Sequence, residues 1–224
     1  MKSLDRLKLM LNEENINKII NTNILLVGVG GVGGAALEML VRSGINNITI
    51  IDFDVFEESN LNRQIMCLQE DLGKYKVDVA KKRCLNINKD VKITTINKKI
   101  DAKLISELSN KFDYIIDAID DANAKLLLVK FAINNNIKII SSCGTGNRLE
   151  PSKLYITTIW KTNNDPLAKK FRSLLRKEGI SYKLPVVSSS EIPIIKSNVV
   201  ASIATVPNTA GILISNYVIK DIIN

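Results

Sequence analysis

The sequence predicts an α/β fold, in which a mostly parallel sheet has helices on both faces and antiparallel strands extend it in the C-terminal part. Two observations support this fold. Short apolar segments alternate with helical patterns up to residue 142, and a glycine-rich turn connects the first apolar segment to a long helix. Strands that alternate with helices are typical of parallel sheets whose connecting helices cover both faces.

Five apolar segments are the expected strands of the parallel sheet, because each is short and bounded by polar residues. They are residues 23–27, 47–51, 91–96, 113–117 and 137–141. Helices are expected over residues 31–43, 76–88 and 101–108. Gly44 is suited to end the first of these helices, and Asp101 is a candidate N-cap of the last.

The pattern changes after residue 142. Residues 153–161 alternate apolar and polar side chains like an antiparallel strand, residues 166–177 predict a basic amphipathic helix, and residues 207–222 predict a closing helix. No repeat, low-complexity run or Pro/Gly linker divides the sequence. We therefore expect a single domain over residues 1–224, with this tail extending the sheet.

The sequence contains no histidine, which excludes Ser-His-Asp, Cys-His and imidazole-metal chemistries. Its three cysteines, Cys67, Cys84 and Cys143, are far apart, so a structural zinc site or a disulfide framework is not expected. Residues 1–20 are charged throughout and do not resemble a secretory signal. A cytoplasmic protein is the expectation.

Residues 197–219 carry no charge and are long enough to span a bilayer. Polar residues and Pro207 interrupt them, so we expect a buried helix or a subunit interface and no stable membrane insertion.

The net charge of +8 suggests an anionic partner such as tRNA. AT-rich codon usage would also produce this excess of lysines, so charge alone leaves the partner open.

The glycine-rich turn indicates a nucleotide site. Gly28-Val29-Gly30-Gly31-Val32-Gly33 follows an expected strand and opens an expected helix, the context of a Rossmann-like phosphate loop. Glycines permit the tight turn and let a phosphate approach the backbone N–H groups of the helix N-terminus. Gly28, Gly30, Gly31 and Gly33 are therefore candidate nucleotide-binding residues.

Asp52 and Asp54 follow the second expected strand. An acid at the position of Asp52 can accept hydrogen bonds from ribose hydroxyls, which suits NAD as well as ATP. A nicotinamide-dependent oxidoreductase is thus the alternative at this point. The sequence lacks a Tyr-x-x-x-Lys pair and a histidine acid, two common proton donors for carbonyl reduction.

Basic and amide side chains beyond this turn favour ATP. Asn60-Leu61-Asn62-Arg63-Gln64 is a polar cluster, and Lys76 begins the next helix. Arg63 and Lys76 can neutralise a triphosphate and the charge that develops on its α-phosphate, which hydride transfer does not require. Most arginines and lysines are solvated surface cations without a binding role. The phosphate role of Arg63 and Lys76 is therefore inferred from the motifs beside them.

Asp117-Ala118-Ile119-Asp120-Asp121 ends the fourth expected strand, at the edge where ligands of open parallel sheets bind. Magnesium prefers one or two carboxylates together with phosphate oxygens and water. Asp120 is the candidate metal ligand, whereas Asp121 can instead cap the following helix.

These motifs, taken together and in order, resemble the adenylation domain of ubiquitin-activating-type enzymes. The resemblance covers about residues 7–142 and adds Gly73 to the motifs above. It implies ATP and Mg²⁺ as cofactors and adenylation of a carboxylate. It places Gly28, Gly30, Gly31, Gly33, Asp52, Asp54, Asn60, Arg63, Gln64, Lys76 and Asp120 at the nucleotide, with Arg63, Lys76 and Asp120 as the catalytic set.

The second half is similar to the branch of that family that dehydrates threonylcarbamoyladenosine in tRNA. Its motifs are Lys161-Thr162, Asp165-Pro166-Leu167-Ala168 and Ser188-Ser189-Ser190-Glu191. The resemblance implies that the threonylcarbamoyl carboxylate becomes an adenylate and that the neighbouring carbamoyl group then closes a ring, releasing AMP. Such a ring closure needs neither a histidine base nor a cysteine thioester, because proximity supplies much of the rate.

The resemblance also sets the expected organisation and partners. Residues 1–22 form an N-terminal helical arm, residues 23–142 the nucleotide-binding core, and residues 143–224 an extension for substrate and dimer contacts. The family implies a homodimer in which Arg6 reaches the partner's ATP, and a sulfur-transfer partner is compatible with it. Cys143 is expected to be a buried structural cysteine.

Three other functions remain as alternatives. The chain could adenylate the C-terminal glycine of a ubiquitin-like sulfur carrier, although zinc-binding cysteine pairs found in some such activators are missing. The others are the nicotinamide oxidoreductase and a non-enzymatic nucleotide-binding protein. The cations of residues 166–177, namely Lys169, Lys170, Arg172, Arg176 and Lys177, suit phosphate contacts with tRNA but also fit a solvated helix face.

Overall fold

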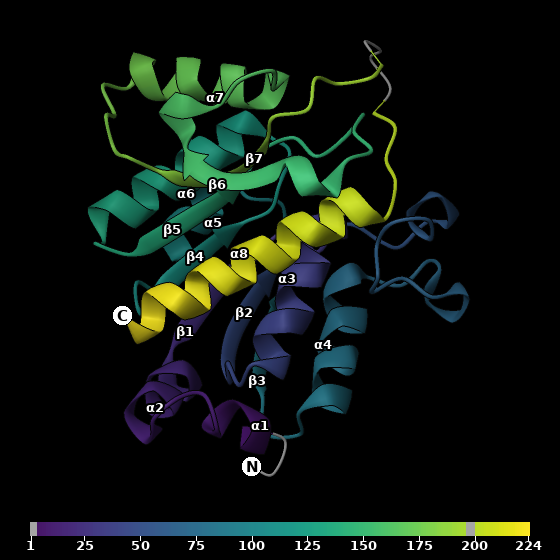
Figure 1. The fold of residues 1–224 in the computed structure, drawn as a ribbon, viewed down its shortest axis with the longest axis vertical. Coiled ribbons are helices and arrows are strands. Elements are labelled where there is room, and N and C mark those ends of the chain that lie inside the picture. Colours follow the sequence, from purple (N-terminus) through teal and green to yellow (C-terminus); the bar gives the residue numbers. More distant parts are fainter. Residues whose placement is uncertain (1–3, 196–199) are drawn as a thin grey trace.

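The computed structural model describes residues 4–195 and 200–224. A seven-stranded sheet runs through it in the order β3-β2-β1-β4-β5-β7-β6 (Figure 1). The strands are β1 (Asn23–Val27), β2 (Asn47–Ile51), β3 (Lys92–Ile96), β4 (Tyr114–Asp117), β5 (Lys138–Ser142), β6 (Leu154–Thr158) and β7 (Pro185–Ser189). Only the β6–β7 pair is antiparallel among them.

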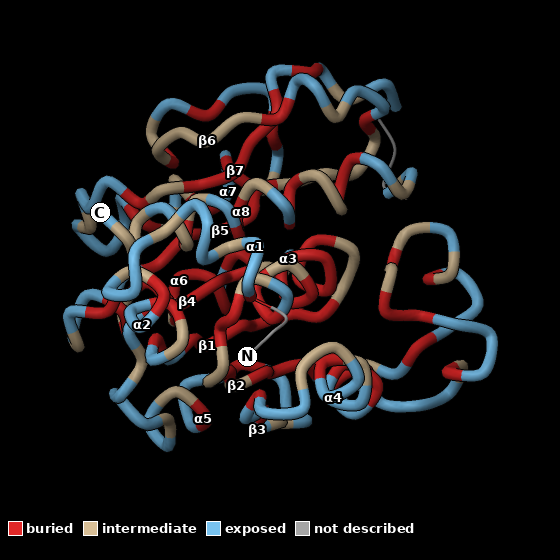
Figure 2. Tube along the Cα trace, turned by 60° about the horizontal axis from the view of Figure 1, so that its bottom comes forward, coloured by how far each residue is buried: buried red, intermediate tan, exposed pale blue. Residues whose placement is uncertain are grey.

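Helices cover both faces of the sheet, and each face has its own apolar cluster. On one face lie α2 (Glu13–Asn21), α3 (Gly31–Arg42), α4 (Lys76–Ile87) and α8 (Thr205–Ile223). On the other lie α5 (Ala102–Glu107), α6 (Ala122–Asn134) and α7 (Pro166–Lys177). The central strands β1 and β4 are buried between these layers (Figure 2), as expected for parallel strands.

The register of the parallel strands brings four strand ends to one edge. Val27 is level with Ile51 on one side and Asp117 on the other, and Asp117 is level with Ser141. The loops that follow β1, β2, β4 and β5 therefore leave the sheet side by side. This is the edge at which ligands of open parallel sheets bind.

The predicted fold class is confirmed, with shifts of one or two residues at several ends. The strand β7 was not predicted. Residues 153–161 also differ, because the strand stops at Thr158 and a 3₁₀ turn follows (Ile159–Lys161). There the hydroxyl of Thr162 donates to the carbonyl of Ile159 at 2.8 Å. Apolar residues continue into this turn as Ile159 and Trp160, so the sequence did not show where the strand ends.

The closing helix α8 starts at Thr205, two residues before the predicted Pro207. It packs closely against α3, because a Cβ built on Gly211 would lie 2.3 Å from the carbonyl oxygen of Val32. No helix in the described part of the chain is long and apolar enough to cross a membrane. Residues 197–199, which began the uncharged segment, lie outside the described residues.

Candidate active site

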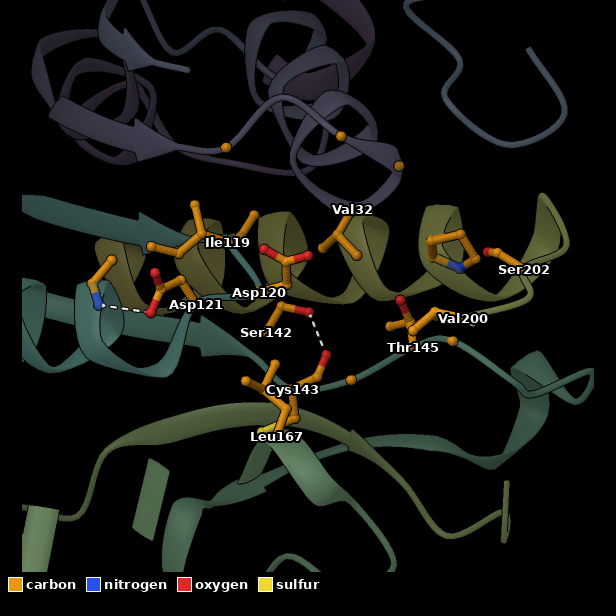
Figure 3. A pocket seen from close by; sticks show the side chains of 18 of the residues that line it. Val32, Ile119, Asp120, Asp121, Ser142, Cys143, Thr145, Leu167, Val200 and Ser202 are labelled. Atoms are coloured by element: carbon orange, nitrogen blue, oxygen red, sulfur yellow. Dashed lines mark hydrogen bonds between the residues drawn. The ribbon is translucent and has the colours of Figure 1, made fainter. Parts of the chain in front are cut away.

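A cavity of about 1430 Å³ opens at the edge where the four strands end. Ligand pockets commonly measure about 300–1,000 Å³, so this cavity has room for more than one small ligand. Its walls come from the glycine loop, the loops after β2, β4 and β5, the start of α7 and the segment before α8 (Figure 3). Both halves of the sequence therefore contribute to one site.

The glycine loop is shaped by two close backbone contacts. Gly28 has a φ of +90°, and a Cβ there would lie 2.7 Å from the carbonyl oxygen of Ala118. A Cβ on Gly33 would lie 1.8 Å from the carbonyl oxygen of Gly28. Gly30 differs, because nothing lies within 4 Å of its built Cβ. Gly28 and Gly33 thus serve the packing of the loop, whereas Gly30 leaves open space.

The loop leads into the N-terminus of α3, whose N-cap residue Gly30 offers no side-chain hydrogen bond. The N–H groups of the first helical turn have no partners within a helix, and their dipoles give this end a partial positive charge. Gly30 and Gly31 line the cavity. This end of α3 therefore presents hydrogen-bond donors to an anionic group.

Asp52 joins the glycine loop to the turn after β2. One of its carboxylate oxygens accepts from the backbone N–H of Val29 at 2.6 Å, and the other from that of Asp54 at 2.9 Å. Burial raises the pKa of Asp52 above its ordinary value, while these two hydrogen bonds lower it in part. The carboxylate borders the cavity and fixes the loop while retaining lone pairs for a ligand.

Lys76 begins α4 and points its ammonium group at Asp54. The Nζ to Oδ2 distance is 3.0 Å, and the backbone N–H of Lys76 donates to the carbonyl of Asp54. Both residues line the cavity. The side chain of Asp54 is half exposed, whereas that of Lys76 is buried.

The polar cluster after Asp54 lies against the same cavity. Asn60 completes the capping box of a 3₁₀ turn, because its Oδ1 accepts from the N–H of the N-cap residue Glu57 at 3.1 Å. Arg63 donates to the carbonyl of Ser59 at 2.7 Å. Gln64 is buried, and its Oε1 has no hydrogen-bond partner within the described residues. Since a buried unpaired oxygen is costly, Gln64 has capacity for a donor from a ligand.

The three aspartates after β4 have different surroundings. Asp117 is buried against Lys125, and Asp121 caps α6 by accepting from the N–H of Asn123 at 2.8 Å, as predicted. Asp120 is exposed at the cavity wall, and no hydrogen bond or ion pair engages its carboxylate among the residues described (Figure 3). It is the carboxylate of this group that remains available to a ligand.

The second half of the chain builds the far wall. Asp165 caps α7 through the N–H of Ala168 and also accepts from the N–H of Gly144 at 2.8 Å. The buried guanidinium of Arg148 donates to the carbonyls of Gly144 and Asn164. These bonds hold the loop after β5 against the start of α7.

Arg6 does not lie at this cavity. It belongs to the short helix α1 (Asp5–Lys8), and Leu4 beside that helix packs against Gly44. Gly44 follows the C-terminal end of α3, so this arm sits at the opposite edge of the sheet (Figure 1). Arg6 is exposed there, and a role at a nucleotide would require a second copy of the chain.

Known proteins match both the sequence and this architecture. Residues 4–224 match the ThiF family. The chain belongs to the ThiF family. The tRNA threonylcarbamoyladenosine dehydratase of Bacillus subtilis is 32% identical over 242 residues, which cover 100% of this chain and 95% of that protein. That of Haemophilus influenzae is 35% identical over 166 residues, which cover 74% of this chain and 64% of that protein.

A solved structure of the ThiF family agrees with the fold. The crystal structure of the Escherichia coli tRNA N6-threonylcarbamoyladenosine dehydratase in complex with ATP has a TM-score of 0.93 and 28% identity to this chain. The match covers 99% of this chain and 93% of that one. The resemblance inferred from the ordered motifs, including its dehydratase branch, is confirmed.

Sequence reasoning missed several residues that shape this ThiF-family site. Lys125 is the most important, since its ammonium bonds both oxygens of Asp117 at 3.0 Å and the carbonyl of Ser142 at 2.8 Å. The hydroxyl of Ser141 also donates to Asp117 at 2.6 Å. A lysine directly before an apolar run of a helix was the available signal. Arg148 and Gly211 carried none, because Asn164 and Val32, which they contact, are remote from them in the sequence.

Proposed function

We propose that this protein dehydrates threonylcarbamoyladenosine in tRNA by way of an acyl-adenylate, using ATP and releasing pyrophosphate and AMP. One observation carries the proposal: four segments far apart in the sequence, bearing Gly30, Arg63, Lys76 and Asp120, line a single cavity that continues to the loop after β5. The related dehydratases named above support the choice of substrate.

In the first step, a carboxylate oxygen of the threonylcarbamoyl group attacks the α-phosphorus of ATP, and the bond to pyrophosphate breaks. The N–H groups at Gly30 and Gly31 bind phosphate oxygens. Arg63 and Lys76 neutralise the charge that develops as the bond breaks, the largest contribution that a site without an acid-base residue can make. Asp52 accepts hydrogen bonds from the ribose hydroxyls.

Asp120 is the residue that would hold Mg²⁺. It fits a hard cation, because it is an oxygen donor without a protein partner among the described residues and lines the same cavity as Gly30, Arg63 and Lys76. Asp117 and Asp121 are already engaged by Lys125 and by the start of α6. When bound, the ion would screen phosphate charge and favour departure of pyrophosphate.

In the second step, the neighbouring carbamoyl group attacks the carbonyl carbon of the adenylate. It loses a proton, and the bond between that carbon and the AMP oxygen breaks, so the base loses one water overall. The chain contributes chiefly by holding the base in the cavity, whose lining includes Thr145 and Leu167. No cysteine thioester is required.

We further propose a homodimer in which Arg6 of one copy reaches the ATP of the other. Its position at the opposite edge of the sheet is the reason to assign it across an interface. An Arg6→Ala variant mixed with a Lys76→Ala variant tests this role. Activity that appears only in the mixture supports it, because each mixed dimer then contains one intact site.

Mass spectrometry of tRNA nucleosides tests the main proposal. Protein, ATP and Mg²⁺ are incubated with threonylcarbamoylated tRNA, and with the same tRNA lacking the modification as control. We expect loss of one water from the modified adenosine and AMP formation that requires the modification. AMP formation stimulated by a ubiquitin-like sulfur carrier, and not by modified tRNA, would instead support the alternative reaction.

A further inference from the structure

The outward face of α7 carries a row of cations. Its exposed basic residues are Lys169, Lys170, Arg176 and Lys177, which we call the α7 basic surface. Ala168, Phe171 and Leu175 point the other way and are buried. Because residues three, four and seven apart share a side of a helix, these cations follow one side of α7 over two turns.

The charge of this surface is not balanced by nearby acids. Within the described residues, none of its four cations forms an ion pair, although Arg176 lies 5.6 Å from the Trp160 ring centroid. Glu178 at the end of α7 pairs with Lys130 on α6 at 2.6 Å. Asp165 is buried at the start of α7. The surface therefore retains its positive field.

The helix is held firmly enough to present these charges in fixed positions. Arg172, on its inner side, donates to the carbonyl of Thr162 at 3.0 Å and also to its hydroxyl. Phe171 and Leu175 pack into the apolar cluster of this face. Arg172 thus serves to anchor α7 to the turn after β6, and the exposed lysines are left for a partner.

The α7 basic surface begins at the proposed catalytic cavity. Lys169 and Arg172 line the cavity, and Lys177 lies two turns away from Lys169. At about 1.5 Å per residue these two lysines are roughly 12 Å apart along the axis. One strand of a nucleic acid duplex carries a phosphate about every 3.4 Å of axis, so this length faces about three phosphates.

We propose that the α7 basic surface binds the phosphate backbone of tRNA and so directs the modified adenosine into the cavity. This inference rests on the proposed function and adds the surface on which its substrate docks. A free small anion would require a recess with convergent donors. The cations are instead spread along an exposed helix, which suits a long polyanion with many charges.

Equilibrium binding of threonylcarbamoylated tRNA over a range of salt concentrations tests the proposal. The test variant is Lys170→Gln/Lys177→Gln, which leaves the cavity residues intact. The matched control is Lys81→Gln/Lys82→Gln on α4, which removes the same charge from another helix. Lys81 and Lys82 are both exposed, and neither forms an ion pair among the described residues. ATP affinity and the urea midpoint are measured for all three proteins.

For the test variant we expect roughly tenfold weaker tRNA binding near 0.15 M salt, and a plot of log affinity against log salt that is less steep by about 1.5–2 units. ATP affinity and the urea midpoint should match wild type. The control pair should change tRNA binding less than twofold.

Two results would overturn the assignment. Equal losses in both pairs would mean that only net charge matters, and unchanged binding in the test pair would mean that tRNA docks elsewhere. Both leave the proposed dehydration intact. Failure of wild-type protein to bind tRNA at all would remove the proposed function together with this surface.

Discussion

Two lysine–aspartate pairs flank the site and have opposite characters. Lys76 and Asp54 lie 3.0 Å apart at the cavity wall, where the side chains are 7% and 46% exposed. Lys125 and Asp117 also lie 3.0 Å apart, but their side chains are 1% and 0% exposed. The first pair has an aspartate that water reaches, whereas the second is sealed between β4, β5 and α6.

In the proposed function Lys76 takes part in the chemistry, whereas Lys125 stabilises the fold. A buried charge without its partner is strongly destabilising, so the fold depends on Lys125. An exposed aspartate that loses its partner is rehydrated, so the fold tolerates loss of Lys76. Lys125 ties the ends of β4 and β5, from which the two loops with Asp120 and Thr145 enter the cavity. Lys125 is therefore a positioning residue for both loops.

Replacement of Lys125 by alanine should give the largest effect on stability. We expect a loss of about 3–5 kcal/mol in the free energy of unfolding, because Asp117 would be left charged and buried. Urea denaturation followed by circular dichroism measures it. A Lys125→Met/Asp117→Asn variant removes both charges and should recover much of the loss. A Lys125→Ala protein as stable as wild type would refute the holding role.

Replacement of Lys76 by alanine should affect chemistry and leave stability nearly unchanged. We expect AMP formation to fall by at least about 100-fold, the effect of removing a group that stabilises charge in the transition state. The urea midpoint should stay close to wild type. Arg63→Ala should behave alike, and wild-type rates in both variants would contradict the phosphate roles assigned to them.

The glycine loop offers the same contrast at smaller scale. Gly33→Ala places a methyl group 1.8 Å from the carbonyl oxygen of Gly28, so we expect a destabilisation of about 1–3 kcal/mol. Gly30→Ala meets no protein atom within 4 Å. It should fold normally and bind ATP about tenfold more weakly, roughly 1.4 kcal/mol. Calorimetric titration with ATP and urea denaturation compare the two variants. Equal free energies of unfolding for Gly33→Ala and Gly30→Ala would contradict the different roles given to these glycines.

Cys143 should show the smallest effect. It lines the cavity but is buried, and this burial raises the pKa of its thiol to about 12. The reactive thiolate is therefore scarce at neutral pH, and activity should resist iodoacetamide at pH 7.5. Cys143→Ala should retain most of the turnover. Rapid inactivation that ATP prevents would instead point to a covalent role for the thiol.

The local motifs of the first half were readable because their physics is local. A glycine loop between a strand and a helix, and the N-caps Asp101 and Asp121, depend on neighbours within a few residues. The strand β7 was not predicted, since its five residues contain only two apolar ones and become a strand by pairing with β5 and β6. Pairing partners remote in the chain leave little trace in a short window.

The sequence by itself determined the fold class, the glycine loop and the family, because periodicity and ordered motifs are properties of the chain. Only the tertiary structure decided which residues with the same side chain are sealed in the core, which cap a helix and which face the cavity. Three aspartates are nearly adjacent in the sequence, yet their surroundings differ. Asp117 is sealed against Lys125, Asp120 faces the cavity and Asp121 caps α6. Solvation and partner geometry make that distinction, and both arise only when the chain folds.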